Sequence, residues 1–262
     1  MSFIKKTLAS FGIGSARVDT ILKHEALVPG QMLHVDVHVY GGASTQTIDN
    51  IEMKLCCQYV AEVKNREDRR QQGAFIKETY VLASWALPYA FEINPGQDKV
   101  FPVDLNVPWN TPSTVGDSKV WLETGLDIAH SLDPTDKDML TVRPDPLLDG
   151  VFTALEDAGL RIRQVECEEA TGFELPFVQE FEFVPVEGDF LGRWRHLEMI
   201  AYRNQSQLQL WFEVDREKSG DQGLMASLVG LGKLKRKMTL DASHDPVLAG
   251  AEVLAYLDET TG

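Results

Sequence analysis

The chain has 262 residues, of which 44% are hydrophobic and 25% are charged. This apolar content can offset the conformational entropy that is lost on folding, so the composition excludes a largely disordered protein. The formal net charge is −15, which argues against a nucleic-acid partner, because such binding needs Lys and Arg to displace phosphate counterions. The length suits two domains of ordinary size better than one.

The start of the chain carries a candidate amphipathic helix. Phe3, Ile4, Leu8 and Phe11 recur at helical spacing. We expect this helix to pack on its own domain, and the alternative is a weak anchor to a membrane or to a partner. No run of about 18 apolar residues is present, so the sequence predicts no membrane span.

The first half of the chain is predicted to consist of successive β-strands. In residues 51–63 every second side chain is apolar, which is the period of a sheet with one buried and one solvated face. The same alternation recurs in residues 33–39, 101–107 and 120–128. Pro102 lies on the polar face of its strand, where the missing N–H indicates a sheet edge. Many strands without an intervening helical pattern predict an antiparallel β-sandwich.

A helix is predicted to connect two β-rich halves. The stretch Arg143-Pro144-Asp145-Pro146 does not continue a strand, and Asp145 is expected to cap a helix that begins at Pro146. Gly159 supplies the stop signal. The predicted organisation is a first domain over residues 1–143, a connecting helix over 144–159 and a second domain over 160–262.

The second half returns to strand-like alternation in residues 160–163, 181–183, 197–202 and 208–214. Helices are predicted over residues 223–231 and after Asp245-Pro246. The apolar face of the second of these helices is expected to consist of Val247, Leu248, Ala251, Leu254 and Leu257. The predicted class is therefore all-β, with two consecutive antiparallel sandwiches, a short connecting helix, and minor helices at both termini.

Catalytic and metal-binding spacings are missing from the sequence. It contains no His-Glu-x-x-His and no Gly-x-Ser-x-Gly. The best metal candidate is His34-x-Asp36-x-His38, but the outer two Cα atoms of a straight strand stand about 13 Å apart. One ion with bonds of about 2 Å cannot take all three ligands, although His34 and Asp36 could share one with another strand. A solvated polar face is the preferred interpretation, so we predict no catalytic, cofactor-binding or metal-binding residues.

The cysteines indicate a reducing compartment. Cys56, Cys57 and Cys167 form an odd set without Cys-x-x-Cys spacing, which is typical of reduced thiols and favours the cytoplasm. Cys56 and Cys57 are neighbours on one strand and point to opposite faces. We expect Cys57 in the core and Cys56 on the outside, where it would be oxidisable.

Two candidate interaction features stand out. One is a dense basic run that consists of Lys233, Lys235, Arg236 and Lys237. It is expected to lead, as a loop, into a short strand near Met238. In so acidic a chain this run could bind an acidic partner or anionic lipid, and the alternatives are a solvated loop or pairing with acidic residues of the same chain. Trp109 lies in a proline-rich turn and is the tryptophan that we expect to be most accessible.

Three groups of residues resemble a known family. They are the opening residues 1–6 and 12–20, the segments 125–128, 133–136 and 142–144, and the stretch 175–183, Leu-Pro-Phe-Val-Gln-Glu-Phe-Glu-Phe. Together they are similar to the SpoOM family of bacterial stage-zero sporulation-control proteins, over the chain up to about residue 240. The resemblance implies that both sandwiches are arrestin-like. It also implies a regulatory, partner-binding role without established catalytic residues.

The function predicted from these features is that of a regulatory adaptor in stress, developmental or cell-division control. Arrestin-like sandwiches would bind other proteins through their surfaces and through strand addition to exposed edges. The identity of the protein partners stays open, as does self-association into a homo-oligomer. One alternative is a peripheral membrane scaffold that uses the N-terminal helix and residues 233–237. Another is a metal-dependent enzyme at His34 and Asp36.

Overall fold

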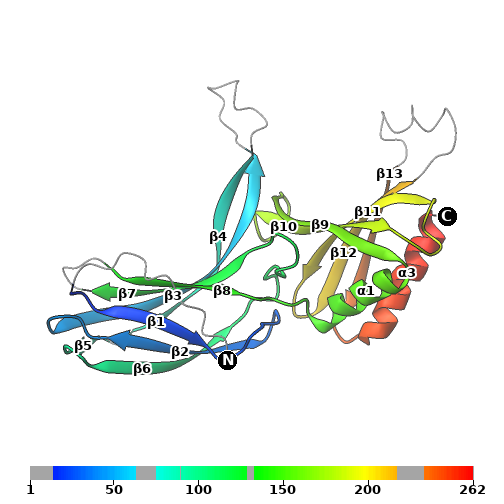
Figure 1. Ribbon diagram of the computed structural model, residues 1–262. Coiled ribbons are helices and arrows are strands. Elements are labelled where there is room, and N and C mark those ends of the chain that lie inside the picture. Colours follow the sequence, from blue (N-terminus) through cyan, green and yellow to red (C-terminus); the bar gives the residue numbers. More distant parts are fainter. Residues whose placement is uncertain (1–13, 63–74, 89, 129–132, 217–232, 262) are drawn as a thin grey trace, which may run out of the picture.

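The computed structural model describes residues 14–62, 75–88, 90–128, 133–216 and 233–261. Figure 1 shows two lobes that follow each other along the chain: the described elements of the first are strands, and those of the second are strands and the helices α1 and α3. The described helices include none that is long and apolar enough to cross a membrane. The predicted N-terminal helix and the predicted helix over residues 223–231 lie outside the described residues.

The first lobe has two β-layers. One layer has the strand order β1-β2-β6, so that β6 is an edge strand as Pro102 predicts. Its strands are β1 (Arg17–Leu22), β2 (Met32–Tyr40) and β6 (Asp98–Asn106). In the other layer β3 pairs with β4 and β5, and with β7, which in turn pairs with β8. These strands are β3 (Gln46–Glu62), β4 (Phe75–Leu87), β5 (Phe91–Ile93), β7 (Val120–Ile128) and β8 (Thr135–Leu140).

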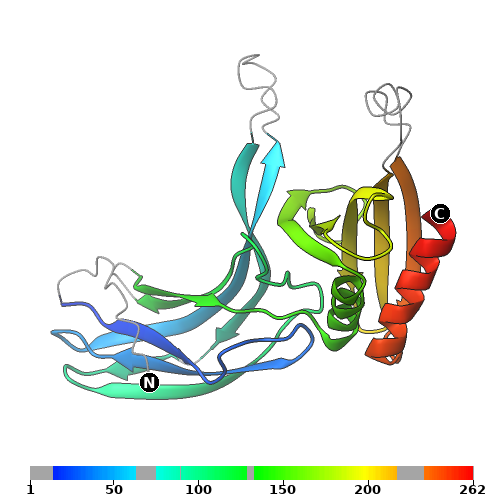
Figure 2. The same cartoon turned by 45° about the vertical axis from the view of Figure 1, so that its right-hand side comes forward.

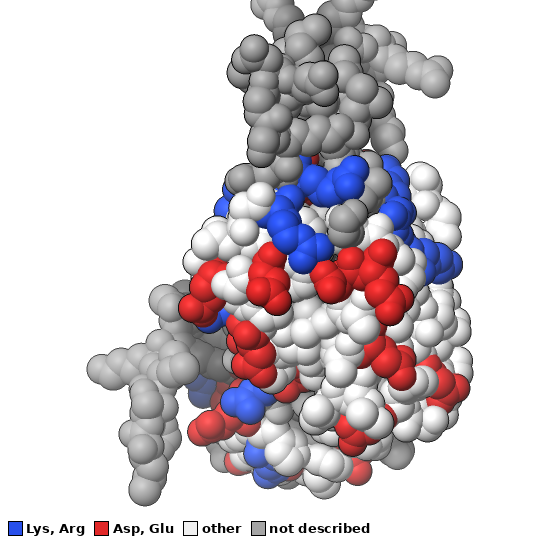
Figure 3. Space-filling model, turned by 90° about the vertical axis from the view of Figure 1, so that its right-hand side faces the viewer, with Lys and Arg blue, Asp and Glu red and all other residues white. Residues whose placement is uncertain are grey.

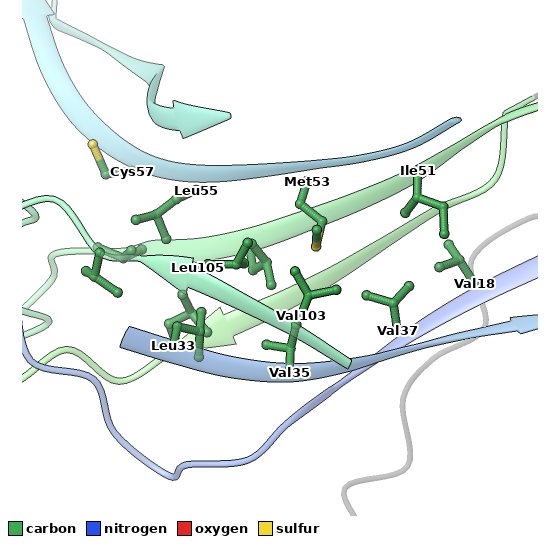
Figure 4. Close-up of a cluster of buried hydrophobic side chains, with 14 of the residues drawn as sticks. Val18, Leu33, Val35, Val37, Ile51, Met53, Leu55, Cys57, Val103 and Leu105 are labelled. Carbon is green, nitrogen blue, oxygen red and sulfur yellow. The ribbon is translucent and has the colours of Figure 1, made fainter. Parts of the chain in front are cut away.

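The core of the first lobe lies between these two layers. Figure 4 shows Val35 and Val37 of β2 pointing toward Ile51 and Met53 of β3, and these four side chains are almost completely buried. They occupy alternate positions on their strands, as the sequence predicts. The first lobe is therefore the predicted sandwich, and the all-β class is confirmed.

Helix α1 (Pro146–Asp157) begins where the sequence predicts it. The Asp145 side chain caps it by accepting a hydrogen bond of 3.1 Å from the Leu147 backbone N–H. Gly159, with a φ of +87°, follows the helix and adopts a conformation that side chains with a Cβ rarely take. The apolar stripe of the helix is buried and includes Leu148, Val151, Phe152 and Leu155.

The five described strands of the second lobe form an antiparallel sheet in chain order, with helices over one face. Its strands are β9 (Leu160–Glu169), β10 (Phe177–Pro185), β11 (Trp194–Arg203), β12 (Gln207–Arg216) and β13 (Lys233–Asp241). Figure 2 shows α1 and α3 (Pro246–Thr261) side by side against the sheet. Phe181 and Leu210 of the sheet share one core with Val151 of α1 and Val253 of α3. Helix α1 is thus a part of this core as well as a connector.

The buried face of α3 differs from the prediction. Val247 and Leu248 are 77% and 62% exposed, whereas Ala249, Val253 and Leu257 are buried. The reason is a close approach of the two helices, because a Cβ on Gly250 would lie 2.5 Å from the Gly150 carbonyl oxygen. Contact between glycines, and not the most apolar stripe, sets the orientation of α3.

The two lobes share a sheet connection and a part of their cores. Val60 of β3 pairs in parallel with Glu168 of β9, and the core of the first lobe includes Cys167, Leu175 and Phe177 from beyond the connecting helix. The predicted domain bounds, residues 1–143, 144–159 and 160–262, remain a prediction.

Candidate interaction surfaces

Strand β4 has an unpaired edge among the described strands. It pairs with β3 over residues 51–62 and with no other described strand. Three of its apolar side chains reach solvent: Phe75 is 72% exposed, Ile76 44% and Val81 42%. Figure 1 shows the outer part of β4 rising away from the first lobe. An exposed, partly apolar strand edge is a template on which another extended chain can pair.

A β-bulge lies where the outer part of β4 begins to rise away from the first lobe. Leu55 lies opposite Ala83 and Cys56 opposite Val81, so that Leu82 has no partner on β3. Such an extra residue bends a strand and increases its twist. We call residues 56–62 and 75–81, beyond the bulge, the arm.

Aromatic contacts hold the arm against the second lobe. The Phe177 ring of β10 stacks on Tyr59 at a centroid distance of 5.2 Å and meets Tyr80 edge-on at 5.8 Å. The Tyr59 hydroxyl donates a hydrogen bond of 2.7 Å to Glu78. This hydrogen bond, with a smaller contribution from burial, raises the pKa of Tyr59 to about 12. Both strands of the arm are therefore fixed in place while the far edge of β4 stays unpaired by any described strand.

The predicted basic run lies on strand β13 and not in a loop. The Lys235 ammonium is 3.2 Å from Glu213, and the Lys237 ammonium is 4.6 Å from the centroid of the Trp211 ring. Arg236 donates to the Thr260 carbonyl of α3, and the backbone of Lys233 pairs opposite Asp215. The structure thus shows pairing within the chain for Lys235, Arg236 and Lys237. Binding of an acidic partner or of anionic lipid by this run stays a prediction.

Helix α3 lies along β13. The Tyr256 hydroxyl donates a hydrogen bond of 3.1 Å to the Lys237 carbonyl, and Leu240 is buried together with Val253 and Leu257. Figure 3 views this face of the molecule and shows Lys and Arg gathered at one end, with Asp and Glu beside them. A neighbouring helix and lysine side chains are two devices that protect a strand edge from further pairing.

Trp109, the other predicted interaction residue, is half-buried at the junction of the two lobes. A Cβ on Gly30 would lie 2.4 Å from its ring, and the Arg203 guanidinium lies 4.6 Å from the ring centroid. Arg203 also forms a buried ion pair of 3.2 Å with Asp145. The cavity beside them has a volume of about 50 Å³, room for about one or two water molecules. A role of Trp109 in binding partners stays a prediction.

The polar residues on β2 are paired with neighbours. His34 Nδ1 lies 2.6 Å from Asp104 Oδ1, and His38 Nδ1 lies 3.6 Å from Asp98 Oδ2. Asp36 forms an ion pair with Lys23. Within the described ranges no three His, Cys, Asp or Glu side chains are placed to hold one metal ion. The arrangement is that of a polar sheet face whose side chains lie close to polar neighbours.

All three cysteines are reduced and buried, including Cys56, which was expected to face outward. Cys56 lies across from Trp121 on β7 and Val81 on β4, so both neighbours cover it. Burial is the main cause that raises the pKa of Cys56, and it also raises the pKa of Cys167 to about 11. These thiols are therefore in their unreactive, protonated form at neutral pH.

The second strand of the arm, in β4, is the feature that reasoning from the sequence missed. Residues 75–82, Phe-Ile-Lys-Glu-Thr-Tyr-Val-Leu, are rich in β-branched and aromatic types. They lack clean alternation because both faces of this strand are partly exposed. Composition was the available signal for a strand, but no local pattern states that one of its edges is left unpaired.

The geometry defines a two-lobed, mostly β protein in which β4 has an edge that no described strand pairs. Such an edge is a template on which another extended chain can pair.

A model of the SpoOM protein family matches residues 4–218, and the chain belongs to this family. The sporulation-control protein spo0M of Bacillus subtilis (strain 168) is 38% identical over 235 residues, which are 89% of this chain and 88% of that protein. The crystal structure of Spo0M from Bacillus subtilis matches with a TM-score of 0.77 and 31% identity, covering 95% of this chain and all of that one. The family is one of sporulation control and not a known enzyme family. Strand β13 and helix α3 lie beyond the residues that the family model matches.

Proposed function

We propose that this chain is a regulatory adaptor of the cytoplasm that binds an extended segment of a partner protein along the free edge of β4. Membership in a sporulation-control family supports the regulatory role, and three reduced, buried cysteines support a reducing compartment. The process that the adaptor serves would be stress, developmental or cell-division control. The proposal includes no catalytic step.

The observation that carries the proposal is the combination of an unpaired edge and exposed apolar side chains on the arm. A partner strand would form main-chain hydrogen bonds with the edge, which supply affinity without regard to sequence. Phe75, Ile76 and Val81, exposed along the same stretch, would contact apolar side chains of the partner and supply selectivity. The contacts of Phe177 keep the arm in place, so that little ordering entropy is lost on binding.

Site-specific photo-crosslinking in the host cell tests the proposal. A photoreactive amino acid replaces Thr79, which is exposed on β4, or Thr239, which is exposed on β13. The two positions are matched, because both are threonines on terminal strands of the same sheet. We expect a defined protein adduct from position 79 and none from position 239. Equal adduct patterns at both positions, or no adduct at position 79, would contradict the proposal.

A further inference from the structure

Two histidine rings lie next to each other at one end of the β1-β2-β6 layer. His34 belongs to β2, and His24 follows β1 just after Lys23, whose backbone N–H donates a hydrogen bond of 3.0 Å to the His34 carbonyl. The ring centroids are 5.4 Å apart, and the ring planes meet at 57°. Two imidazoles that bind one zinc ion through bonds of about 2 Å have centroids about 5 Å apart. The observed spacing therefore suits a shared metal ion.

A carboxylate orients the His34 ring from the other side. Strand β2 lies between β1 and β6, and His34 is directly opposite Asp104 of β6. The distance from His34 Nδ1 to Asp104 Oδ1 is 2.6 Å. An ionised carboxylate can only accept a hydrogen bond, so Nδ1 carries the proton and Nε2 keeps its lone pair, facing away from Asp104. A metal-binding histidine usually has such a carboxylate on its second nitrogen.

The surroundings of His24 leave room for an ion and its water. His24 is exposed and lines a cavity of about 80 Å³, which has room for about two or three water molecules. The thioether of Met32, a ligand for soft metal ions, lines the same cavity. The neighbouring Lys23 forms an ion pair with Asp36, which offsets its positive charge.

We propose that His24 and His34 bind a divalent transition-metal ion of the Zn²⁺ type through one ring nitrogen each, with Asp104 as the positioning residue of His34. The described part of the chain places no third His, Cys, Asp or Glu at this ion, so water completes its coordination. Such a site holds the ion reversibly, in contrast to a structural zinc site with four protein ligands. It lies apart from the β4 edge, so its test does not depend on strand addition.

Isothermal titration calorimetry with Zn²⁺ alone tests the proposal. His24→Gln and His34→Gln should each weaken binding at least about tenfold, and the double variant should be little weaker than either, because both rings hold the same ion. His24 is exposed, so its replacement should leave the melting temperature unchanged. The control His244→Gln replaces a histidine beside Glu252 and should change affinity by less than about twofold. Unchanged affinity in His24→Gln, or equal weakening in the control, would overturn the proposal.

Asp104→Ala tests the positioning role. It should weaken Zn²⁺ binding by about tenfold although Asp104 does not contact the ion. The matched control Asp98→Ala removes the same charge from the same strand, beside His38, and should leave the affinity within about twofold. Equal weakening in both variants would overturn this role, because it would show a general effect of charge.

Nuclear magnetic resonance of the imidazole nitrogens gives a readout that a purely structural role would not move. In the unaltered chain the spectrum should show the proton of His34 on Nδ1, and added Zn²⁺ should shift Nε2 of His34 together with one nitrogen of His24. In Asp104→Ala the preference for the Nδ1 proton should be lost. Zn²⁺-dependent shifts at other histidines, with none at His24 and His34, would overturn the proposal.

Discussion

The terminal strands β4 and β13 belong to the same extended sheet and differ in how their outer edges are treated. Strand β13 carries lysines and lies along α3, whose Tyr256 hydroxyl binds the Lys237 carbonyl. Strand β4 carries exposed Phe75, Ile76 and Val81, and no described element lies along its edge. Proteins usually protect strand edges, since an unprotected edge pairs with other chains. This difference between the two edges is the structural basis of the proposed strand addition to β4.

The largest effect is expected from Phe177, the residue that fixes the arm. Phe177→Ala should lower the free energy of unfolding by about 3–4 kcal/mol, because it removes a buried ring and leaves a cavity beside Tyr59 and Tyr80. Urea denaturation followed by tryptophan fluorescence measures this change. Phe177→Leu, which keeps most of the volume, should lose less than half as much. A loss of less than about 1 kcal/mol for Phe177→Ala would show that the contacts of this ring do not hold the arm.

A cation introduced on the β4 edge should weaken partner binding, whereas the loss of a cation from β13 should not affect it. Ile76→Lys places a cation at an exposed edge position and should reduce the partner adduct formed at position 79 by about tenfold, or about 1.4 kcal/mol. Its melting temperature should stay near that of the unaltered chain. Lys235→Gln on β13 serves as the control and should leave the adduct unchanged. A similar reduction in both variants would remove the distinction between the edges.

Smaller effects on stability are expected from the hydroxyl groups of Tyr59, in the arm, and Tyr256, beside β13. Tyr59→Phe should cost about 1 kcal/mol of stability at pH 8, because it removes the hydrogen bond to Glu78. Tyr256→Phe should cost about 0.5 kcal/mol, since its acceptor is a neutral carbonyl.

The cost of Tyr59→Phe should depend on pH. The pKa of Tyr59 is about 12 in the folded chain against 10.0 for a free tyrosine. The stabilisation is therefore complete below pH 10 and disappears as the pH rises toward 12. Denaturant titrations of the unaltered chain and of Tyr59→Phe at several pH values measure it, and a pH-independent difference would contradict the assignment.

The smallest effect is expected from the lysines of β13. Lys235→Thr/Lys237→Thr should change the free energy of unfolding by no more than about 0.5 kcal/mol, because both ammonium groups are exposed to solvent. The chain should keep its oligomeric state, since α3 still lies along the strand. Light scattering coupled to size-exclusion chromatography measures this. Aggregation of the double variant would show that the lysines alone protect this edge.

The sequence predicts the parts of the fold that local patterns report. Alternation in β2 and β3 follows from burial of one face, and the cap at Asp145 follows from short-range hydrogen bonding, so both predictions are confirmed. The orientation of α3 depends on the contact of Gly150 with Gly250, a hundred residues away in the chain. No local pattern contains that contact. The same holds for Cys56, which neighbouring strands cover.

The candidate interaction surfaces also depend on contacts between residues that are far apart in the sequence. The basic residues of β13 are visible in the sequence, but their pairing with Glu213, Trp211 and α3 depends on strand order. The free edge of β4 is likewise a property of sheet topology, because it depends on which strands lie beside it. The composition of residues 75–82 favours a strand, although no strand is predicted there from alternation, and composition does not report a missing neighbour.

Amide hydrogen exchange on the complex captured through position 79 tests the central claim most directly. If a partner strand pairs with β4, backbone amides within residues 75–81 should exchange more slowly in the complex than in the free chain, because they gain hydrogen-bond acceptors. Amides of β13 should exchange at the same rate in both. Unchanged exchange throughout β4, in a complex that is otherwise intact, would contradict strand addition.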